Sequence, residues 1–421
     1  MWEKLQYAWN IKEVRNGLLF ALAMMLVFRL VANIPIPGVD LVALRAFIEG
    51  NRALGLLNLF AGGTIRNFSI VAMGVAPYIT ASIIVQLLGM IFPKVEEIQK
   101  DGEAGRRRLN QWTRVLTVPL AIIQSFGLLA IMRQSAVPIL TNNSVFHIAM
   151  IIATVTAGTM FLMWIGELIQ EKKVGNGMSL LIAAGILADL PASASQFLAT
   201  FDASQNWLAV VLYVLAAVAM VVGIIFITEG QRNVPVQYAR QVRGGTGAST
   251  LPLRINMTGV IPIIFAMSIL LFPTLVAQFL IGSRTVWLAD GARWVIATMQ
   301  NQTLYAALYL VLTVAFTYFY TSIVFQPEKI AENLQKQGAF VPGIRPGRAT
   351  AEYLNEVISR ITLGGALFLG VIAVTPFIAQ YFTKTQVLAL GGTSLLIVIS
   401  VVIESVKQVE SQVTMRQYDS Y

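Results

Sequence analysis

The feature that most constrains this chain is a series of ten apolar stretches, each close to 20 residues long, separated by more polar segments. A membrane hydrocarbon core roughly 30 Å thick requires about 20 helical residues to cross it. Inside that core the backbone finds no water, so a spanning segment has to be helical. The sequence therefore predicts an all-α polytopic membrane protein with ten transmembrane helices. They are expected near residues 17–37, 72–92, 115–133, 145–166, 178–200, 207–228, 257–281, 303–325, 361–382 and 386–403.

Lysine and arginine residues are distributed unevenly between the two sides that ten spans define. One side, which includes both termini, carries 22 of the 30 basic residues, and the other carries seven, while Arg29 lies inside the first span. Basic residues accumulate in cytoplasmic loops. The sequence therefore predicts that the N- and C-termini both lie in the cytosol.

Two short motifs each occur twice, in the same order. Gly-Val-x-Pro-x-Ile occupies 74–79 and 259–264, at the second and seventh spans, and Gly-x-Ser-Leu-Leu-Ile occupies 177–182 and 392–397, at the fifth and tenth. The chain thus consists of two five-helix halves, residues 1–200 and 201–405, followed by a cytosolic tail, 406–421. Because five is odd, the halves have opposite orientations, which is typical of inverted repeats around a central path.

Every repeated motif ends on an isoleucine, and two more isoleucines follow one helical turn later. Residues four apart share a helix face, so each half can direct its isoleucines toward a common midplane. An aliphatic constriction of this kind binds no ion and excludes water when it is narrow. Ordinary packing between helices is the alternative. The six residues are Ile79, Ile83, Ile182, Ile186, Ile264 and Ile397.

A half-apolar segment at residues 56–71 is too short to cross the membrane and contains Gly62-Gly63 and Arg66. Such a segment is either re-entrant, surrounded by protein or by a water-filled cavity, or an interfacial helix. Because it leads directly to Pro77 and Ile79, we favour a mobile cover over the central path.

The residue types that carry most enzyme chemistry are scarce. The chain has no cysteine and one histidine, His147, and no nucleophile, zinc or nucleotide-binding motif is present. The intramembrane acids of ion-coupled transporters are also missing, because Glu167, Asp189, Glu229 and Glu404 are expected at helix ends. Arg29 is expected to extend outward to the membrane surface. A passive channel is favoured over a secondary transporter or an intramembrane enzyme, and no cofactor or metal is expected.

Two cytosolic loops, residues 229–256 and 326–355, are longer than the topology requires and contain Gly, Pro and basic residues. Loops of this length in compact proteins are usually functional or disordered. A basic loop suits an acidic protein surface or RNA phosphates. We therefore expect partner docking there.

Several longer stretches resemble the bacterial SecY family, the channel subunits of the protein translocase. They include "NIPIPGVD" (33–40), "LNLFAGGTIRNFSI" (57–70), "GVAPYITASIIVQLL" (74–88), "GEAGRRRLNQWTR" (102–114), "GNGMSLLIAAGI" (175–186), "INMTGVIPIIFA" (255–266), "FVPGIRPG" (340–347) and "GGTSLLIV" (391–398). The resemblance extends from residue 1 to about 410. It implies a ten-helix clamshell that passes unfolded polypeptides across the membrane or sideways into lipid.

The resemblance also assigns roles to residues. The six isoleucines become a pore ring, and a lateral gate opens between spans two and three and spans seven and eight, with Thr80, Gln86 and Asn256 as its polar residues. Arg240, Arg243, Arg345 and Arg348 become docking residues. The implied partners are SecE, SecG, the SecA motor, the ribosome, signal-bearing preproteins and membrane lipids, in the bacterial inner membrane. A plug falls on residues 58–70, with Asn58, Leu59, Phe60, Gly62, Gly63, Thr64, Arg66 and Ser69 as its key residues.

Overall fold

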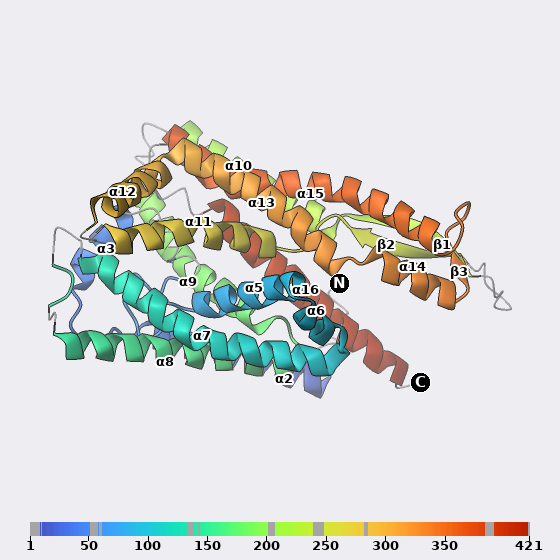
Figure 1. Cartoon of the computed structure of the whole chain (residues 1–421), viewed down its shortest axis with the longest axis horizontal. Coiled ribbons are helices and arrows are strands. Elements are labelled where there is room, and N and C mark those ends of the chain that lie inside the picture. The colour runs from blue at the N-terminus through green and yellow to red at the C-terminus, as the bar shows by residue number, and fades with distance from the viewer. Residues whose placement is uncertain are drawn as a thin grey trace. The chain divides into compact units, whose positions relative to one another are not determined.

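The structure, a computed structural model, describes most of the chain. The described residues are 9, 11–50, 58, 61–133, 138–141, 144–200, 207–238, 248–281, 285–383 and 391–419. Six described helices are long and apolar enough to cross a membrane, and a bent pair makes up to seven. Three shorter apolar helices cover further expected spans (Figure 1). The chain is therefore a largely helical, multi-pass membrane protein.

The chain divides into two compact units. The first contains residues 1–200, 271–297 and 401–421, and the second contains residues 201–270 and 298–400. Three helices belong partly to each unit: α11 (Ile261–Leu280), α12 (Val286–Gln300) and α16 (Gly391–Asp419). Helix α16 continues well past residue 403, where the predicted tenth span ends, so the predicted tail begins as a continuation of this helix.

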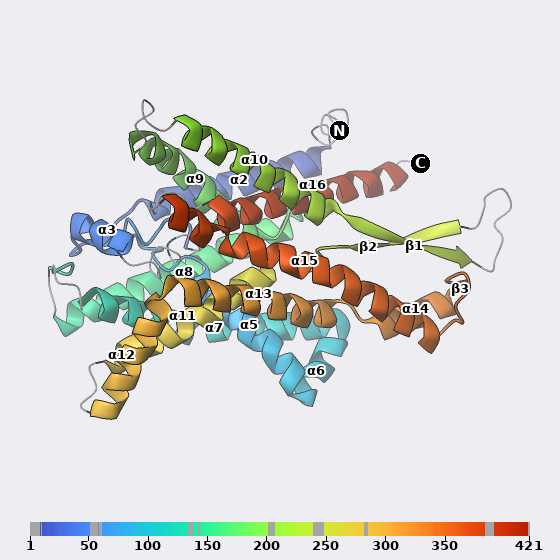
Figure 2. The ribbon, with the colours of Figure 1, turned by 90° about the horizontal axis from the view of Figure 1, so that it is seen from above.

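Among the described residues, seven helices belong to the first unit alone. They are α2 (Lys12–Ala32), α3 (Leu41–Gly50), α5 (Ala76–Ile91), α6 (Pro93–Lys100), α7 (Gly102–Arg133), α8 (Val145–Glu171) and α9 (Gly177–Thr200). The chain bends by 110° between α5 and α6. Pro93 begins α6 and has no backbone N–H with which to continue α5, which explains the break. Figure 2 shows α6 turned away from α5. The predicted cytosolic loop 93–114 is thus helical in the structure.

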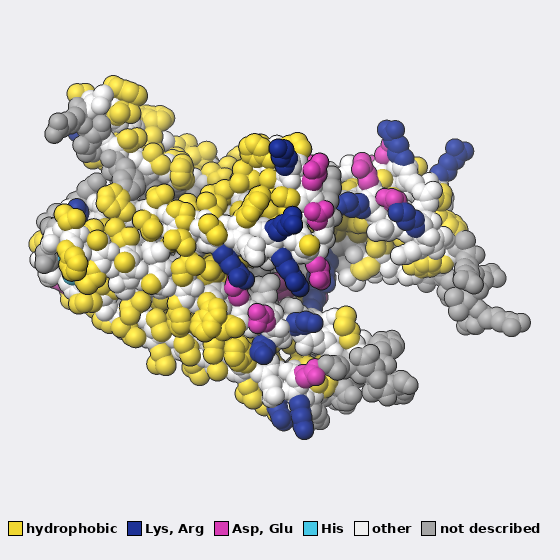
Figure 3. All heavy atoms as spheres, turned by 60° about the horizontal axis from the view of Figure 1, so that its bottom comes forward, with side chains coloured by type: hydrophobic (Ala, Val, Ile, Leu, Met, Phe, Trp, Pro, Cys, Tyr) yellow, Lys and Arg dark blue, Asp and Glu magenta, His cyan; other side chains and the backbone are white. Residues whose placement is uncertain are grey.

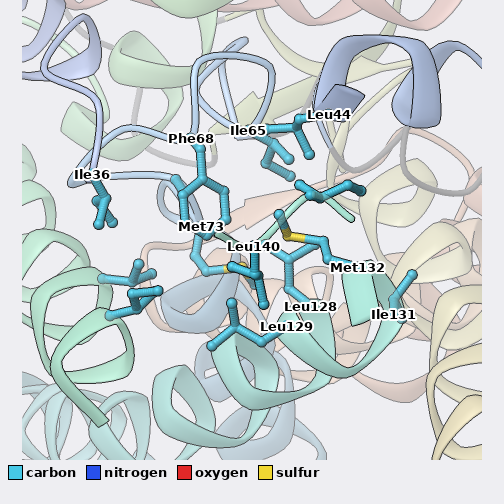
Figure 4. Close-up of a cluster of buried hydrophobic side chains, with 14 of the residues drawn as sticks. Ile36, Leu44, Ile65, Phe68, Met73, Leu128, Leu129, Ile131, Met132 and Leu140 are labelled. Carbon is cyan, nitrogen blue, oxygen red and sulfur yellow. The ribbon is translucent and has the colours of Figure 1, made fainter. Parts of the chain in front are cut away.

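The core of the first unit lies where the segment before α5 meets α7. Ile65, Phe68 and Met73 of that segment are buried together with Leu128 and Met132 of α7 (Figure 4). Burying a large apolar side chain contributes about 1.5–3 kcal/mol relative to leaving it exposed. This core therefore holds residues 61–75 inside the unit, although they contain no helix.

The second unit combines helices with one small sheet. Its own helices are α10 (Trp207–Glu229), α13 (Gln302–Val324), α14 (Pro327–Lys336) and α15 (Arg348–Thr383). The strands β1 (Gln231–Tyr238), β2 (Ala248–Arg254) and β3 (Ala339–Phe340) form an antiparallel sheet with the order β2-β1-β3. The chain is predominantly α-helical, as predicted, and one expected loop additionally contains a β-hairpin.

Candidate functional site

The two Gly-Val-x-Pro motifs adopt the same local backbone in the two units. Gly74 and Gly259 have φ values of 56° and 62°, a left-handed conformation that glycine tolerates best. The carbonyl oxygen of the following valine accepts a hydrogen bond from the first helical turn. Ile79 N–H donates to Val75 O at 3.0 Å, and the Ile264 N–H donates to the corresponding valine oxygen at 3.3 Å. The sequence repeat is thus also a repeat of conformation.

The two Gly-x-Ser-Leu-Leu-Ile motifs also resemble each other in their packing. A Cβ atom on Gly177 would lie 1.8 Å from the Gly166 carbonyl oxygen on α8, and one on Gly392 would lie 2.9 Å from the Ile372 carbonyl oxygen on α15. In both units a glycine therefore lets the start of one helix contact the backbone of the helix before it.

The predicted ring isoleucines lie at the ends of these motifs or one helical turn later. On α5 and α9 of the first unit, Ile83, Ile182 and Ile186 are buried and Ile79 is half-buried. In the second unit Ile397 is buried and Ile264 is half-buried. The one-turn spacing of Ile79 with Ile83 and of Ile182 with Ile186 lies on α5 and α9 of the first unit, whereas Ile264 and Ile397 are single residues on α11 and α16. The ring that would join the units stays a prediction.

The predicted plug is a compact, turn-rich element inside the first unit. Gly63 N–H donates to Asn58 O at 2.8 Å, and the Arg66 N–H donates to Asn58 Oδ1 at 2.9 Å. The Thr64 hydroxyl, fully buried, donates to Ala61 O at 2.7 Å and lies 3.0 Å from Ala72 O. These bonds satisfy polar groups that burial would otherwise leave unpaired.

Other parts of the plug region bond to the chain after α2. Ser69, also buried, forms an isolated antiparallel bridge with Pro35. Two backbone bonds, Ile36 N–H to Phe68 O at 2.9 Å and Ile70 N–H to Ile34 O at 3.1 Å, reinforce it. Two further predicted plug residues, Leu59 and Phe60, lie outside the described residues.

Three helices pack closely against the predicted plug. A Cβ atom on Gly62 would lie 3.1 Å from Gly185 Cα on α9 and 3.3 Å from the Phe28 ring on α2. A Cβ atom on Gly158 of α8 would lie 2.1 Å from the Ile70 carbonyl oxygen. Glycines therefore let the segment pack closely against α2, α8 and α9.

The three predicted gate residues differ in their hydrogen-bond partners. Thr80 on α5 accepts a bond from Gln124 Nε2 on α7 at 3.3 Å, a contact for which the sequence offered no spacing signal. Gln86 Nε2 donates to Ser82 Oγ of its own helix at 3.0 Å. Asn256 is buried in the second unit, and Thr258 donates to its Oδ1 at 3.3 Å. Its Nδ2 has no hydrogen-bond partner among the described residues.

The structure brings the two predicted docking loops together. Strand β1, from the first loop, pairs with β3, from the second, through Gln237 with Phe340 and Tyr238 with Ala339. Beneath the sheet lies a buried apolar cluster that includes Leu354 of α15. The two expected loops therefore form one packed body.

The predicted docking arginines differ in their surroundings. Arg345 is exposed between β3 and α15. Arg348 is also exposed and pairs with Glu352 one turn later, with 3.0 Å between Nε and Oε1. Arg240 and Arg243 lie outside the described residues. Figure 3 shows Lys and Arg side chains gathered beside acidic ones, apart from wide apolar stretches of the same face.

One pair of charges within the apolar helices was not foreseen. Asp189 lies inside α9 rather than at a helix end, so that prediction is wrong for this residue. Its Oδ1 lies 3.4 Å from Arg29 Nη2 on α2, so Arg29 points to a partner within the protein instead of only outward. The signal available in the sequence was that both charges fall within apolar spans. Within the described residues, no group of three His, Asp or Glu side chains suits a metal ion.

Comparison with known proteins agrees with this geometry. The family model described as SecY matches residues 69–406. Protein translocase subunit SecY of Halalkalibacterium halodurans is 42% identical, covering all of both chains, and that of Staphylococcus aureus is 43% identical over 97% of each.

Solved structures show the same fold. A protein-conducting channel matches with a TM-score of 0.64 and 15% identity, over 93% of this chain and 90% of the other. A structure concerned with the plug domain of the SecY protein matches with a TM-score of 0.65 and 16% identity, over 93% and 91%. With a family model over most of its length and relatives above 40% identity over nearly all of it, this chain belongs to the SecY family of protein translocase subunits.

Proposed function

We propose that this chain is the channel through which unfolded polypeptides cross the bacterial inner membrane, with both termini in the cytosol. It is a channel subunit and not an enzyme. Ten transmembrane helices form two inverted halves, a clamshell, and the six isoleucines line the constriction between them. The observation that carries the proposal is the repeated Gly-Val-x-Pro helix start, with matching φ values at Gly74 and Gly259 and the same first-turn bond.

The chemistry of the constriction suits a varied client. A translocating chain presents every kind of side chain, so the narrow point should bind none of them. Aliphatic contacts are short-ranged and undirected, with about 0.1–0.2 kcal/mol per atom pair. Isoleucine is also stiff at its first side-chain torsion, so the constriction keeps its shape. The ring can thus close around an extended chain while it limits ion leakage.

Apolar client segments need a second exit. Each Leu, Ile, Phe or Val favours the membrane by about 0.3–0.6 kcal/mol. A seam between spans two and three and spans seven and eight would let such segments partition sideways into lipid. Thr80, Gln86 and Asn256 are its proposed polar residues, and the Nδ2 of Asn256, buried and without a partner among the described residues, supports this role.

Energy and docking come from partners. No nucleotide-binding motif is present in the sequence, so we propose that the SecA motor or the ribosome supplies the driving force. The packed body of β1, β2, β3 and α15 is the proposed docking site, with exposed Arg345 as its leading residue. Arg240, Arg243 and Arg348 are further candidates. SecE and SecG are the proposed accompanying subunits, and preproteins and lipids the remaining partners.

Photocrosslinking of a stalled preprotein tests the proposal directly. A photoreactive amino acid would be placed at Ile83 and Ile264, one in each half. Ile151 on α8 and Ile358 on α15, both buried, serve as controls. We expect the client to label the first two positions and neither control. Labelling confined to one half would contradict a shared constriction.

A further inference from the structure

An ion pair links two helices of the first unit beside the proposed plug. Arg29 Nη2 on α2 lies 3.4 Å from Asp189 Oδ1 on α9, and each side chain is about one third exposed, at 31% and 33%. Charges within membrane helices are costly and are usually kept for a function. Neither residue belongs to the proposed constriction, gate or docking body, so another role is required.

The plug segment reaches α9 at the same place. A Cβ atom on Gly185 would lie 2.3 Å from Gly62 Cα, and one on Gly63 would lie 2.1 Å from Asp189 Oδ2. Gly185 and Asp189 are four residues apart and therefore share a helix face. On this face of α9, Gly185 contacts the backbone of Gly62, and the Asp189 carboxylate lies against Gly63.

A second cation belongs to the plug itself. The charge of Arg66 acts on the Asp189 carboxylate, and the Arg66 backbone N–H is fixed by Asn58 Oδ1 at 2.9 Å. The Asp189 carboxylate thus pairs with Arg29 on α2 and also lies within reach of the positive charge of Arg66 on the proposed plug. If the plug moves away, Arg66 no longer neutralises the Asp189 carboxylate, but Arg29 still does. The arrangement therefore favours the resting position without leaving a bare charge after opening.

We propose that Asp189 is a positioning residue that holds the plug in its resting place through Arg66 and Gly63, with Arg29 as its permanent partner. The inference rests on the proposed role of residues 58–70 as a plug. The side chains are partly exposed, and solvent screens such pairs, so the hold is weak enough to be reversed by an arriving client.

The test is Asp189→Asn, which removes the charge and keeps the shape. The chain has no cysteine, so Thr64→Cys creates a single thiol at a fully buried position of the plug as a reporter. All variants would carry it, be assembled into the translocase and be reconstituted. Two quantities would be measured: the resting ion conductance in planar bilayers and the rate at which a soluble maleimide labels the thiol at position 64. Loss of about one kcal/mol of plug stabilisation gives about a fivefold rise in both.

The matched control is Glu167→Gln, which breaks another interhelical pair of the same unit, Arg114 Nε with Glu167 Oε1 at 2.6 Å. We expect it to leave both measurements unchanged. Arg66→Gln is the second variant, because it keeps the Arg29 pair that supports the fold. It should raise both measurements as Asp189→Asn does, and the double variant should add little.

The outcomes separate this inference from the proposed function. If the unsubstituted translocase transports preprotein but Asp189→Asn and Arg66→Gln change neither conductance nor labelling, the inference is wrong and the channel proposal stands. The inference also fails if Glu167→Gln produces the same rise, because the effect is then general loosening. If the unsubstituted translocase moves no preprotein under motor drive, the proposed function itself fails.

Discussion

Alanine substitutions at the two repeated glycines, Gly74 and Gly259, offer a test in which each position is the control for the other. The glycines occupy equivalent places before α5 and α11 and have φ values of 56° and 62°. A residue with a Cβ atom in this left-handed region costs about 1–2 kcal/mol. The conformational cost is therefore the same at both positions.

The surroundings of the two glycines differ. A Cβ atom on Gly74 would lie 2.7 Å from Ala61 Cα and 2.9 Å from Ala61 O, whereas one on Gly259 has nothing within 4 Å among the described residues. Carbon atoms pack best at about 3.5–4.0 Å. Accommodating an extra group in such a tightly packed place usually costs about 1–3 kcal/mol of stability. We therefore expect Gly74→Ala to destabilise by about 2–5 kcal/mol, and Gly259→Ala by only the conformational part.

The assay is thermal unfolding of the purified translocase in detergent, followed by tryptophan fluorescence, with the variants ranked by midpoint. Gly74→Ala should have the lower midpoint. Because the clash displaces Ala61 within the proposed plug, it should also raise the labelling of a thiol at position 64. Equal midpoints for the two variants, or a lower one for Gly259→Ala, would refute the reasoning from packing.

Three further predictions concern the constriction, the docking body and the helix contacts. Ile83→Asn and Ile264→Asn should each raise the resting conductance in planar bilayers and admit preproteins with defective signal sequences; unchanged conductance would remove them from the ring. Arg345→Glu should abolish SecA-driven transport into vesicles while the unfolding midpoint is kept, and Arg348→Gln should have less effect because that residue is already paired within its helix. Gly177→Ala places a Cβ atom 1.8 Å from a carbonyl oxygen of α8, so it should lower the unfolding midpoint by several degrees, and a neutral result would contradict this close contact.

The membrane-protein fold class and the internal repeat were largely predictable from the sequence. Apolar length decides membrane spanning, since an unpaired backbone is not tolerated in lipid. Motif spacing predicted that Ile182 and Ile186 share a face, and glycine followed by proline predicted how α5 and α11 begin. These features are local, and local chemistry needs no knowledge of distant contacts.

The loops were less predictable. Residues 229–256 and 326–355 read as basic loops, yet Val234, Leu253 and Leu354 are buried together in one cluster. Short apolar runs in polar segments carry little periodic signal. Pairing of β1 with β3 joins segments about a hundred residues apart, which no local pattern specifies.

The order of residues alone is enough to specify that this chain enters a membrane, repeats itself and starts two helices alike, because helix formation and membrane partitioning depend on nearby residues. The packed fold was needed to show that Asp189 meets Arg29, that Gly62 contacts Gly185, and that the segment before α5 folds as buried turns. Those outcomes depend on which surfaces fit together after the helices pack. A glycine or a charge acquires its role there from a partner far along the chain.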